Sequence, residues 1–501
     1  MRLIFAVSVL FILVAPGPGA AQIWPFERKV AMISVDRAPT TISPVGGGRV
    51  EAERVTMMVP ENRSRSSSRA LAVRFIRIPA RKPEGLPPVL VLADGPAIAA
   101  AEGARWPLYR AISEVADVVL LDPRGTGISD GPLDCASSAG WEGKVADRAT
   151  FVRLYRQAFG ECDAYWRALG HDLRGYTLHE SAEDIAAIAD LLGGKVSLLG
   201  TGSGAQLALA AIRHHPGKVE RAVLISVRGL EQSVRSPVAG ELYLERLQRV
   251  IDQDREALDR FPDIRASIIR LTERLDRDPV TLTIADDSGA ITGERTIGGF
   301  FVQRLVARSI RNPEQLDGLL DGLWRAEAHG DYGYFESRAA ELLPERVELR
   351  AAPTLNLVSQ GAGWGRLEVL KKEARRAAFG DALSFPMPHI LRKSRYYRLR
   401  EGYRRRPGGR TPTLVLAGTL DGLATPEEAI KATRGLKSAR TVVRVENAGR
   451  DLVFATPEIV PMITAFLSRE KVKARTLTAP LPDVSPGGAE SAAGLRRPNG
   501  S

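Results

Sequence analysis

The stretch Lys195–Ile212 reads KVSLLGTGSGAQLALAAI, an apolar strand pattern followed by a glycine-rich turn and a helix pattern. In such a unit the free N–H groups at the start of the helix face the turn and favour negative charge there. The turn fits two kinds of site. It is either the glycine loop of a dinucleotide-binding unit or the sharp turn that carries a catalytic serine.

The dinucleotide interpretation depends on Gly200, Gly202 and Ala205, which match the pattern G-x-G-x-x-A. The next predicted strand ends in LISVRGL and lacks the acidic residue that would bind a ribose hydroxyl. Arg228 could contact a 2′-phosphate instead. Nicotinamide cofactors are not normally available outside the cytoplasm, however, and the N-terminal sequence predicts export. We therefore expect no cofactor and favour the serine turn.

Short apolar runs recur along the chain and are rich in β-branched residues. This pattern is typical of strands that are covered on both faces, and hence of a mostly parallel sheet. The runs are 89–93, 117–121, 196–199, 222–226, 413–417 and 441–445. Helices are predicted over 181–192, with Ser181 as the N-cap, and over 457–467. Together these elements predict an α/β fold with a doubly wound core.

The pattern of apolar residues changes between the predicted strands at 222–226 and 413–417. Charged amphipathic helices dominate there, with one hairpin pattern over residues 281–297. We therefore predict a mainly helical insertion into the core, and a Pro-, Gly-, Ala- and Ser-rich tail that is disordered. The predicted division is 1–21 signal peptide, 22–235 first part of the core, 236–408 helical insertion, 409–468 second part of the core, and 469–501 tail.

The N-terminus has the layout of a secretory signal. Arg2 precedes an apolar run from Leu3 to Ala15, and small residues stand at Gly19 and Ala21. The run is short for a transmembrane helix, and no cysteine follows it that could take a lipid anchor. We expect an exported, periplasmic or secreted protein that is not transmembrane. In such an oxidising compartment the two cysteines, Cys135 and Cys162, are predicted to form a disulfide.

The chain of 501 residues has a formal net charge of +11, and arginine clusters in RKSRYYRLREGYRRR, Arg392–Arg406. This segment is either a solvated basic face or a surface that binds a polyanion. In an exported protein an anionic envelope surface is the expected partner, and nucleic acid is not. The six histidines are scattered, and no metal-ligand spacing occurs, so we expect no metal site.

Several blocks carry a family resemblance. They are VLADGPA (91–97), DVVLLDPRGTGISDGPLDC (117–135), LLGTGSGAQLAL (198–209) and TPTLVLAGTLDGLATPEEA (411–429). With them, residues from about Val59 to Leu467 resemble the secreted prolyl and tripeptidyl aminopeptidases, which are serine peptidases of the α/β-hydrolase fold. The resemblance implies hydrolysis of N-terminal peptide bonds by a Ser, Asp and His triad in that chain order. It also implies that the helical insertion is a lid over the active site.

The triad is incomplete at the position of the base. The acid position is filled by Asp421 in GTLDG, but the base position, a histidine in the family, is Arg450. A guanidinium group stays protonated and cannot accept a proton from a serine. We predict a salt bridge between Arg450 and Asp421 in place of the acid–base pair.

The nucleophile position also departs from the family. Aligning the strand and helix on either side of the turn places Gly202 at the nucleophile, and a shift by one residue would place Ser203 there. We favour Gly202, because the nucleophile is held in a strained backbone conformation that glycine relieves. The oxyanion region, Asp94 and Gly95 together with Ser203, carries a carboxylate where the family has glycine. Asp94 either opposes the charge that develops there or points to solvent.

Three functional hypotheses follow. The leading one is an exported pseudohydrolase that has lost hydrolysis and binds a peptide or a small-molecule ligand under the lid. The second is a working serine hydrolase or aminopeptidase that uses Ser203 and Asp421 with a base from elsewhere, such as His389 or His179. The third is an envelope-binding module that acts through Arg392–Arg406.

Overall fold

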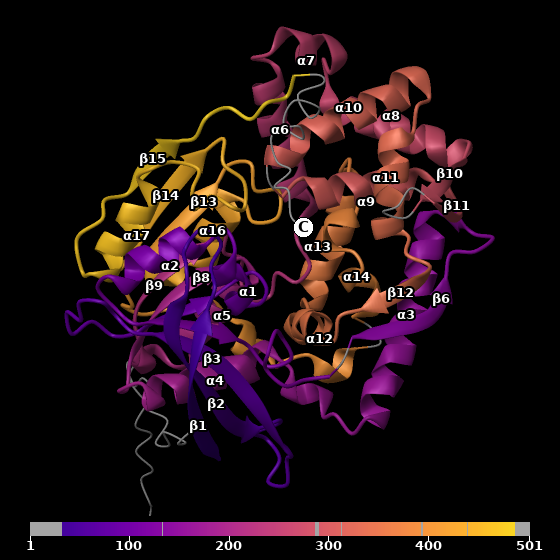
Figure 1. Ribbon diagram of the computed structural model, residues 1–501. Helices are drawn as coiled ribbons and strands as arrows, with labels where there is room; N and C mark the ends of the chain where they lie inside the picture. Colours follow the sequence, from indigo (N-terminus) through magenta and orange to yellow (C-terminus); the bar gives the residue numbers. More distant parts are fainter. Residues whose placement is uncertain are drawn as a thin grey trace, which may run out of the picture.

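The computed structural model describes residues 33–132, 134–285, 290–311, 313–391, 394–437 and 439–485. Its core is one ten-stranded sheet in the order β1-β2-β3-β5-β4-β8-β9-β13-β14-β15 (Figure 1). The strands are β1 Ser34–Ile42, β2 Val50–Pro60, β3 Ala70–Ile78, β4 Val89–Leu92, β5 Val118–Asp122, β8 Val196–Thr201, β9 Val219–Ile225, β13 Thr413–Gly418, β14 Arg440–Glu446 and β15 Arg475–Thr478.

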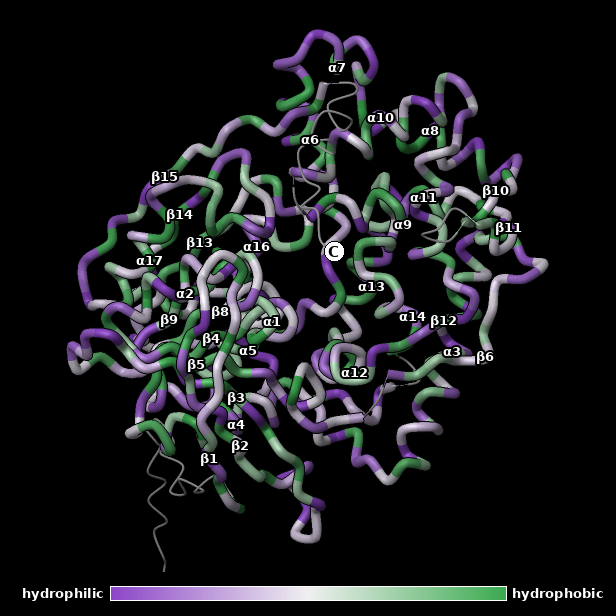
Figure 2. Tube along the Cα trace, viewed as in Figure 1, coloured by the Kyte–Doolittle hydropathy of each residue, from purple (hydrophilic) through white to green (hydrophobic). Residues whose placement is uncertain are grey.

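The sheet is mostly parallel, as predicted. Strands β1, β2 and β3 form an antiparallel meander that joins β5, and every pair from β5 to β15 in the sheet order is parallel. Alternate side chains of a strand go to opposite faces. Leu90 and Leu92 accordingly lie in one hydrophobic core, and Val89 and Val91 in the other. Figure 2 shows the hydrophobic colouring along these central strands.

Helices cover both faces of the sheet. The helices of the core are α1 Ala97–Glu102, α2 Trp106–Ser113, α4 Leu178–Leu191, α5 Ser203–His214, α16 Pro426–Ala432 and α17 Ile459–Leu467. α2 packs against α17 on one face, and α4 packs against α5 on the other. The predicted start of α4 was wrong. Thr177 caps this helix by accepting a hydrogen bond from the N–H of Glu180, and Ser181 lies buried within the helix.

The insertion between β9 and β13 is mainly helical. It contains α6 Pro237–Ile251, α7 Arg255–Arg260, α8 Ile264–Arg277, β10 Val280–Ala285, β11 Ile291–Ile297, α9 Gly299–Ser309, α10 Leu316–His329, α11 Gly333–Leu342, β12 Arg346–Leu349, α12 Ala351–Gln360, α13 Trp364–Ala374, α14 Met387–Ile390 and α15 Glu401–Arg404. The hairpin pattern forms the antiparallel pair β10–β11. In Figure 1 the insertion stands beside the sheet and extends past its upper edge.

One segment that the sequence assigned to the first part of the core lies with the insertion. β6 (Cys135–Gly140) pairs with β12, β7 (Val145–Ala146) pairs with β11, and α3 (Arg148–Ala168) packs against α14. The predicted disulfide joins Cys135 of β6 to Cys162 of α3. Since these strand partners are distant in sequence, a boundary drawn from local patterns could not place them.

The tail prediction was wrong for one segment. Residues 475–478 form β15, which pairs in parallel with β14 and buries Leu477 at the edge of the sheet. The signal peptide and the last residues of the predicted tail, 486–501, lie outside the described residues. Within the part of the chain that the structure describes, no helix combines the length and the apolar character needed to cross a bilayer.

Candidate active site

The turn after β8 places Gly202 between the strand and helix α5. Gly202 has φ +54° and ψ −110°, in a region of backbone conformation that favours glycine. Its N–H donates to the carbonyl of Ile225 in β9 at 2.9 Å. Ser203 is the first residue of α5 and is exposed. The structure therefore puts glycine in the strained position and the serine one residue later, on the helix.

The residues on both sides of the turn have to be small. A Cβ atom at Gly204 would lie 1.8 Å from the carbonyl oxygen of Leu92 in β4. A Cβ atom at Gly200 would lie 2.7 Å from the Cα atom of Ala205. These contacts fix the register in which Gly202 is the centre of the turn, because a shift by one residue would bring larger side chains to both flanks.

The Asp94 carboxylate holds the N–H group that would bind an oxyanion. In turns that carry a nucleophile, the backbone N–H after the nucleophile contributes to the oxyanion hole. Here that group belongs to Ser203, and it donates to Oδ1 of Asp94 at 2.9 Å. The Ser203 hydroxyl donates to the same oxygen at 2.7 Å. Gly95, with φ +136°, continues the turn that carries Asp94. A carboxylate at this position repels a second negative charge.

Arg450 reaches the same carboxylate from the opposite side. It follows β14, and its Nε donates to Oδ2 of Asp94 at 2.6 Å. The side chain is 10% exposed. Its backbone is fixed by Arg311, whose carbonyl accepts from the Arg450 N–H at 2.9 Å, and by Ser226, whose hydroxyl donates to the Arg450 carbonyl at 3.0 Å. Ser226 itself has φ +55°, a strained value for a residue other than glycine.

Asp421 lies behind this pair and is fully buried. Its Oδ1 accepts from the N–H groups of Leu423 and Ala424 at 2.8 and 3.0 Å. Its Oδ2 lies 3.8 Å from Nη1 of Arg450, which is an ion-pair distance without a hydrogen bond. The predicted pairing of Arg450 with Asp421 is thus present only as this long contact, and the short partner of Arg450 is Asp94. The sequence alone did not indicate that Asp94 is the partner of Arg450, because the two residues are 356 positions apart.

The pKa values of the Asp94 and Asp421 carboxyl groups are shifted in opposite directions. The Asp94 side chain is 39% exposed, and the partial loss of water around it would by itself raise its pKa, but Arg450 and the hydrogen bonds from Ser203 outweigh this effect and hold the pKa well below its ordinary value. Burial raises the pKa of Asp421, and the charge of Arg450 only partly opposes this. A carboxylate with a lowered pKa is a weak base. Asp94 is therefore poorly suited to take the proton of the Ser203 hydroxyl that it binds.

The Asp-x-Arg-Gly block at 122–129 supports the turn that carries Asp94. Oδ1 of Asp122 accepts from the N–H of Ala97 at 2.7 Å, and Oδ2 accepts from the N–H of Ile128 at 3.1 Å. A Cβ atom at Gly127 would lie 1.8 Å from Oδ2 of Asp122. The block thus joins the loop after β4 to the loop after β5. Its role in the site is to hold the position of Asp94.

A buried ion network lies beneath the same loops. The side chain of Arg124 is fully buried, and its Nε and Nη2 both donate to the carboxylate of Asp184 at 2.7 Å. Its Nη1 donates to the carbonyls of Glu61 and Gly175. Arg63 binds Asp184 at 2.6 Å as well. This network ties β5 to helix α4 and to the loop after β2.

A polar cluster that the sequence analysis missed lies close to the turn. It consists of Gln206, Arg228, Gln232 and Glu428, all buried. Gln206 donates to the carbonyl of Gly229 at 2.7 Å, and Gln232 donates to Glu428 at 3.3 Å. Among the described residues, the Arg228 side chain donates one hydrogen bond, at 3.4 Å to the Gln232 carbonyl, and burial lowers the pKa of Arg228 to about 10. From the nearby LISVRGL segment the sequence analysis singled out only Arg228, and it did not predict a polar cluster there.

The six histidines have their hydrogen bonds, ion pairs and ring contacts elsewhere. Among the described residues, Ser203 is bound to no imidazole. His389, a candidate base, binds Asp381 at 2.7 Å within the insertion. His179 lies 3.7 Å from Glu183. The other four histidines also have partners away from the turn, among them Glu61 for His171, Tyr403 for His214, Glu183 for His215 and Trp324 for His329.

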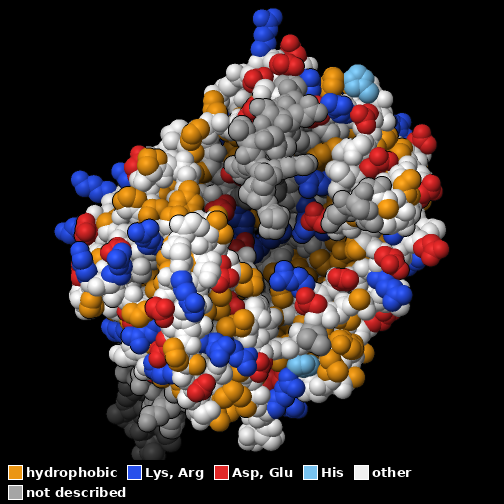
Figure 3. All heavy atoms as spheres, in the orientation of Figure 1, with side chains coloured by type: hydrophobic (Ala, Val, Ile, Leu, Met, Phe, Trp, Pro, Cys, Tyr) orange, Lys and Arg blue, Asp and Glu red, His pale blue; other side chains and the backbone are white. Residues whose placement is uncertain are grey.

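The molecular surface is hollowed between the core and the insertion, and Figure 3 shows basic side chains on the floor of this hollow. Arginine is the residue type that gathers near the turn, through Arg228, Arg311 and Arg450. Over the described ranges, no group of three or more His, Cys, Asp or Glu side chains is arranged to hold a metal ion.

A family described as the alpha/beta hydrolase fold matches residues 96–286, from the loop before α1 to the end of β10. This match covers the strand–turn–helix unit around Gly202, and it agrees with the sheet order and the covering helices. The chain has the α/β-hydrolase fold. No curated protein sequence matches the chain. The aminopeptidase resemblance is finer than this match, and it enters below only as a proposal.

Solved structures with the α/β-hydrolase fold are similar to the chain over most of its length. One is an α/β hydrolase enzyme from a Medee basin deep-sea metagenome library, at 10% identity, with 81% of this chain and 97% of the other covered and a TM-score of 0.33. A second is a meta-cleavage product hydrolase from Pseudomonas fluorescens, at 13% identity, 80% and 95% coverage and a TM-score of 0.34. A third is a thermophilic esterase from Thermogutta terrifontis, at 16% identity, 86% and 98% coverage and a TM-score of 0.34.

The contribution of Asp94 to stability is expected to be lost in acid. Because its folded pKa is lowered, the ionised form stabilises the folded state above the ordinary value of 3.8, and the gain is lost as the pH falls below that value. We expect the difference in unfolding free energy between the wild type and Asp94→Asn to be constant from about pH 7 to pH 5 and to shrink below about pH 4, as measured by urea unfolding.

The corresponding Asp421→Asn variant provides the comparison. The folded pKa of Asp421 is raised, so its neutral form is favoured in the folded state, and ionisation costs stability as the pH rises through the folded pKa. The difference between the wild type and Asp421→Asn is therefore expected to change with the opposite sign. A flat difference for Asp94→Asn down to about pH 3 would contradict the assignment of a lowered pKa.

Proposed function

We propose that the chain is a pseudohydrolase, an α/β-hydrolase-fold protein that does not hydrolyse and binds a peptide or a small-molecule ligand between the core and the insertion. The proposal rests on the side chains that fill the space next to Gly202. A Cβ atom at Gly202 would lie 2.2 Å from Nη2 of Arg450 and 2.5 Å from Cγ of Asp94. The space of a nucleophile side chain is therefore filled by an ion pair.

Two further features support the loss of hydrolysis. The N–H of Ser203, which would stabilise an oxyanion, donates to a carboxylate. The base position holds Arg450, and the hydroxyl of Ser203 binds Asp94, a carboxylate whose pKa is lowered. A working serine hydrolase needs a base that accepts the proton of the nucleophile. The described contacts of Ser203 supply none.

Unsatisfied polar atoms near the turn favour a polar ligand. Nε of Arg228 and Oε2 of Glu428 are buried without hydrogen-bond partners among the described residues, and Nη1 of Arg450 and Oδ2 of Asp421 have only their 3.8 Å contact with each other. Leaving such a group unpaired costs about 1–3 kcal/mol, so a ligand that pairs with it gains free energy. A peptide has the donors and acceptors required, and the aminopeptidase-like motifs point to the same class. We propose a short peptide as the ligand.

Labelling with a fluorophosphonate serine probe tests the loss of hydrolysis. We expect the wild type to label no faster than Ser203→Ala. Gly202→Ser/Arg450→His restores two triad positions but leaves Asp94 on the Ser203 N–H, so we expect little labelling. Adding Asp94→Gly frees that donor, and the labelling rate is expected to rise about a hundredfold, the usual effect of one oxyanion-hole donor. Labelling of the wild type that Ser203→Ala abolishes would refute the proposal and support the active-hydrolase hypothesis.

Thermal unfolding in the presence of tripeptides tests the ligand. A peptide that binds only the folded state raises the melting temperature with concentration. We expect this rise for the wild type and a smaller rise for Arg228→Met, which removes the guanidinium whose Nε has no hydrogen-bond partner among the described residues but keeps a long apolar side chain. If Arg228→Met and the wild type respond equally to every peptide, the proposed site is wrong.

A further inference from the structure

Helix α13 (Trp364–Ala374) carries an exposed face that combines two apolar side chains with a row of cations. Trp364 is 71% exposed and Val369 is 53% exposed. Lys371, Lys372, Arg375 and Arg376 are exposed on the same helix and on the residues that follow it. We name these six residues the α13 surface. Tryptophan combines a large apolar ring system with one polar N–H group and is enriched at membrane interfaces for that reason.

Five of the six residues, on α13 and its C-cap Arg375, lie on one half of the helix, and Arg376 follows the helix. At 100° per residue, Trp364, Lys371 and Arg375 lie within one narrow stripe, and Lys372 and Val369 follow on one side of it. Leu370, on the opposite side, is 6% exposed and anchors the helix to the insertion. The face is therefore presented outward by the fold rather than left exposed by a frayed end.

The cations of the α13 surface are free of acidic partners. Among the described residues, Lys371, Lys372, Arg375 and Arg376 form no ion pair, and Glu368 is the one exposed acidic residue on this helix. Two further carboxylates lie nearby and have partners of their own. Glu241 accepts from Nε of Arg265 at 2.5 Å, and Glu373 accepts from the hydroxyl of Ser236 at 2.7 Å. The four cations outnumber the carboxylates of Glu368 and Glu373 on the same helix, so the surface keeps a net positive charge.

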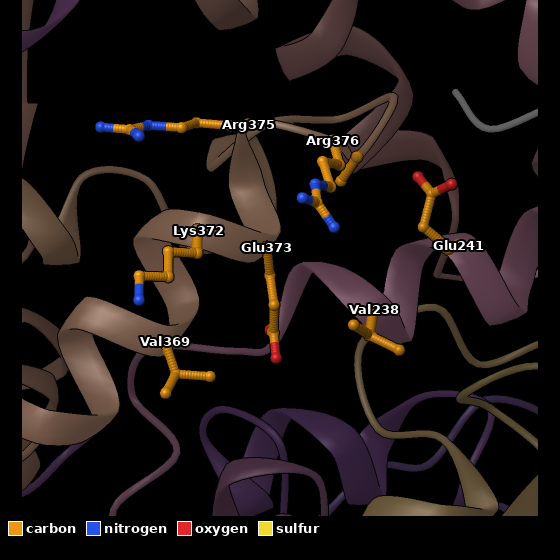
Figure 4. Close-up of a pocket in the computed structure, with 8 residues that line it drawn as sticks. Val238, Glu241, Val369, Lys372, Glu373, Arg375 and Arg376 are labelled. Atoms are coloured by element: carbon orange, nitrogen blue, oxygen red, sulfur yellow. The ribbon is translucent and has the colours of Figure 1, made fainter.

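A cavity of about 560 Å³ opens beside this face, between α13 and α6. Figure 4 shows Val369 on one side and Val238 of α6 on the other, with Glu373 between them. Val238 is itself 45% exposed. Lys372, Arg375 and Arg376 border the same cavity. Val238 and Val369 therefore give the cavity apolar walls, and its margin is mixed, with the carboxylates of Glu241 and Glu373 beside the three cations.

We propose that the α13 surface docks on an anionic lipid bilayer, with Trp364 and Val369 in the interface and the four cations on the phosphate groups. Exposed tryptophan and basic side chains together are features of helices that lie along a membrane interface. Each basic residue near an anionic leaflet adds to the attraction. This inference is independent of the pseudohydrolase proposal, because it uses a different surface and different residues.

The Arg392–Arg406 segment, proposed from the sequence as an envelope-binding surface, is less well suited. In its described part, Tyr397 and Arg404 are buried, and Arg398 donates to the carbonyl of Ala362 at 3.1 Å. Arg174 stacks on Tyr396 with its guanidinium 3.5 Å from the ring centre. Arg405 and Arg406 remain exposed, however, and they provide a matched control.

Co-sedimentation with vesicles tests the proposal. We expect the wild type to bind vesicles that contain phosphatidylglycerol and not to bind vesicles of pure phosphatidylcholine. Binding is expected to weaken as the salt concentration rises. Lys371→Glu/Lys372→Glu is expected to weaken binding at least tenfold. Arg405→Glu/Arg406→Glu changes the net charge by the same amount elsewhere and is expected to leave binding within about twofold. Trp364→Ala is expected to weaken binding to the same vesicles without changing the salt dependence.

Three outcomes would overturn the proposal. The first is failure of the wild type to bind either vesicle. The second is an equal loss in both charge-reversal variants, which would assign binding to net charge. The third is equally tight binding of a soluble anionic polysaccharide that is indifferent to Trp364→Ala, which would assign the surface to a polymer. Because every substituted side chain is exposed, circular dichroism and thermal unfolding are expected to match the wild type.

Discussion

Gly202→Ala is expected to lower the free energy of unfolding by about 3 kcal/mol, although it adds a single methyl group. Two costs combine. The backbone, at φ +54°, holds any residue other than glycine in a strained conformation, at about 1–3 kcal/mol. The new Cβ atom would also lie 2.2 Å from Nη2 of Arg450 and 2.5 Å from Cγ of Asp94, so the ion pair must move and its hydrogen bonds to Ser203 must weaken.

Urea unfolding measures the effect, and Gly85→Ala separates the two costs. Gly85 has φ +69°, and nothing lies within 4 Å of the position of its Cβ atom, so its substitution carries the backbone strain alone. Gly202→Ala is expected to cost more than Gly85→Ala. Combining Gly202→Ala with Asp94→Gly is expected to recover part of the difference, because the obstructing carboxylate is gone. If the two alanine variants lose the same stability, the ion pair does not fill the turn.

Asp184→Ala is expected to cost about 3–5 kcal/mol, the usual result of removing one partner from a buried ion pair. The guanidinium of Arg124 is fully buried and gives two of its hydrogen bonds to this carboxylate, and Arg63 gives a third. Glu180 remains close, at 3.7 Å from Nη1 of Arg124, but it already binds Arg63 at 2.7 Å. One buried guanidinium is therefore left short of acceptors.

Asp190→Ala, on the same helix, is the control for this prediction. Asp190 is 47% exposed and pairs with Lys218, which is also partly exposed, so the pair is screened by solvent. Surface pairs of this kind contribute about 0–1 kcal/mol. We expect urea unfolding to show a small effect for Asp190→Ala and a large one for Asp184→Ala. A loss below about 1 kcal/mol for Asp184→Ala would mean that the network does not hold the loops together.

The strands of the core were predictable because each is a continuous apolar run. The patterns at 89–93 and 413–417 correspond to β4 and β13, whose residues are buried throughout. The turn at Gly202 was predictable for a similar local reason, since the small residues around it are demanded by contacts within the β8–α5 unit and with β4. Local sequence therefore carried most of the fold of the core.

Features that depend on distant partners were not predictable in the same way. The place of α3 depends on β6 and β7, whose strand partners β12 and β11 come later in the chain. The short bond from Arg450 goes to Asp94, not to Asp421, because the loop after β4 lies against the turn after β8. The sequence identified both Arg450 and Asp94 as departures from the aminopeptidase pattern. That these two side chains bind each other could be seen only in the folded chain.

The Asp94 carboxylate is covalently attached beside the donors that it binds, so it competes with any free anion as a tethered ligand does. The effective concentration of a group on a short tether is on the order of millimolar or higher. Acetate, phosphate or a fragment with one carboxylate would have to exceed that concentration to reach the N–H of Ser203. We therefore expect small anions that make a single contact to be excluded from the turn, and ligands that make several contacts at once to be less affected. In a binding screen, small carboxylates are expected to bind weakly to Asp94→Gly and not to bind to the wild type.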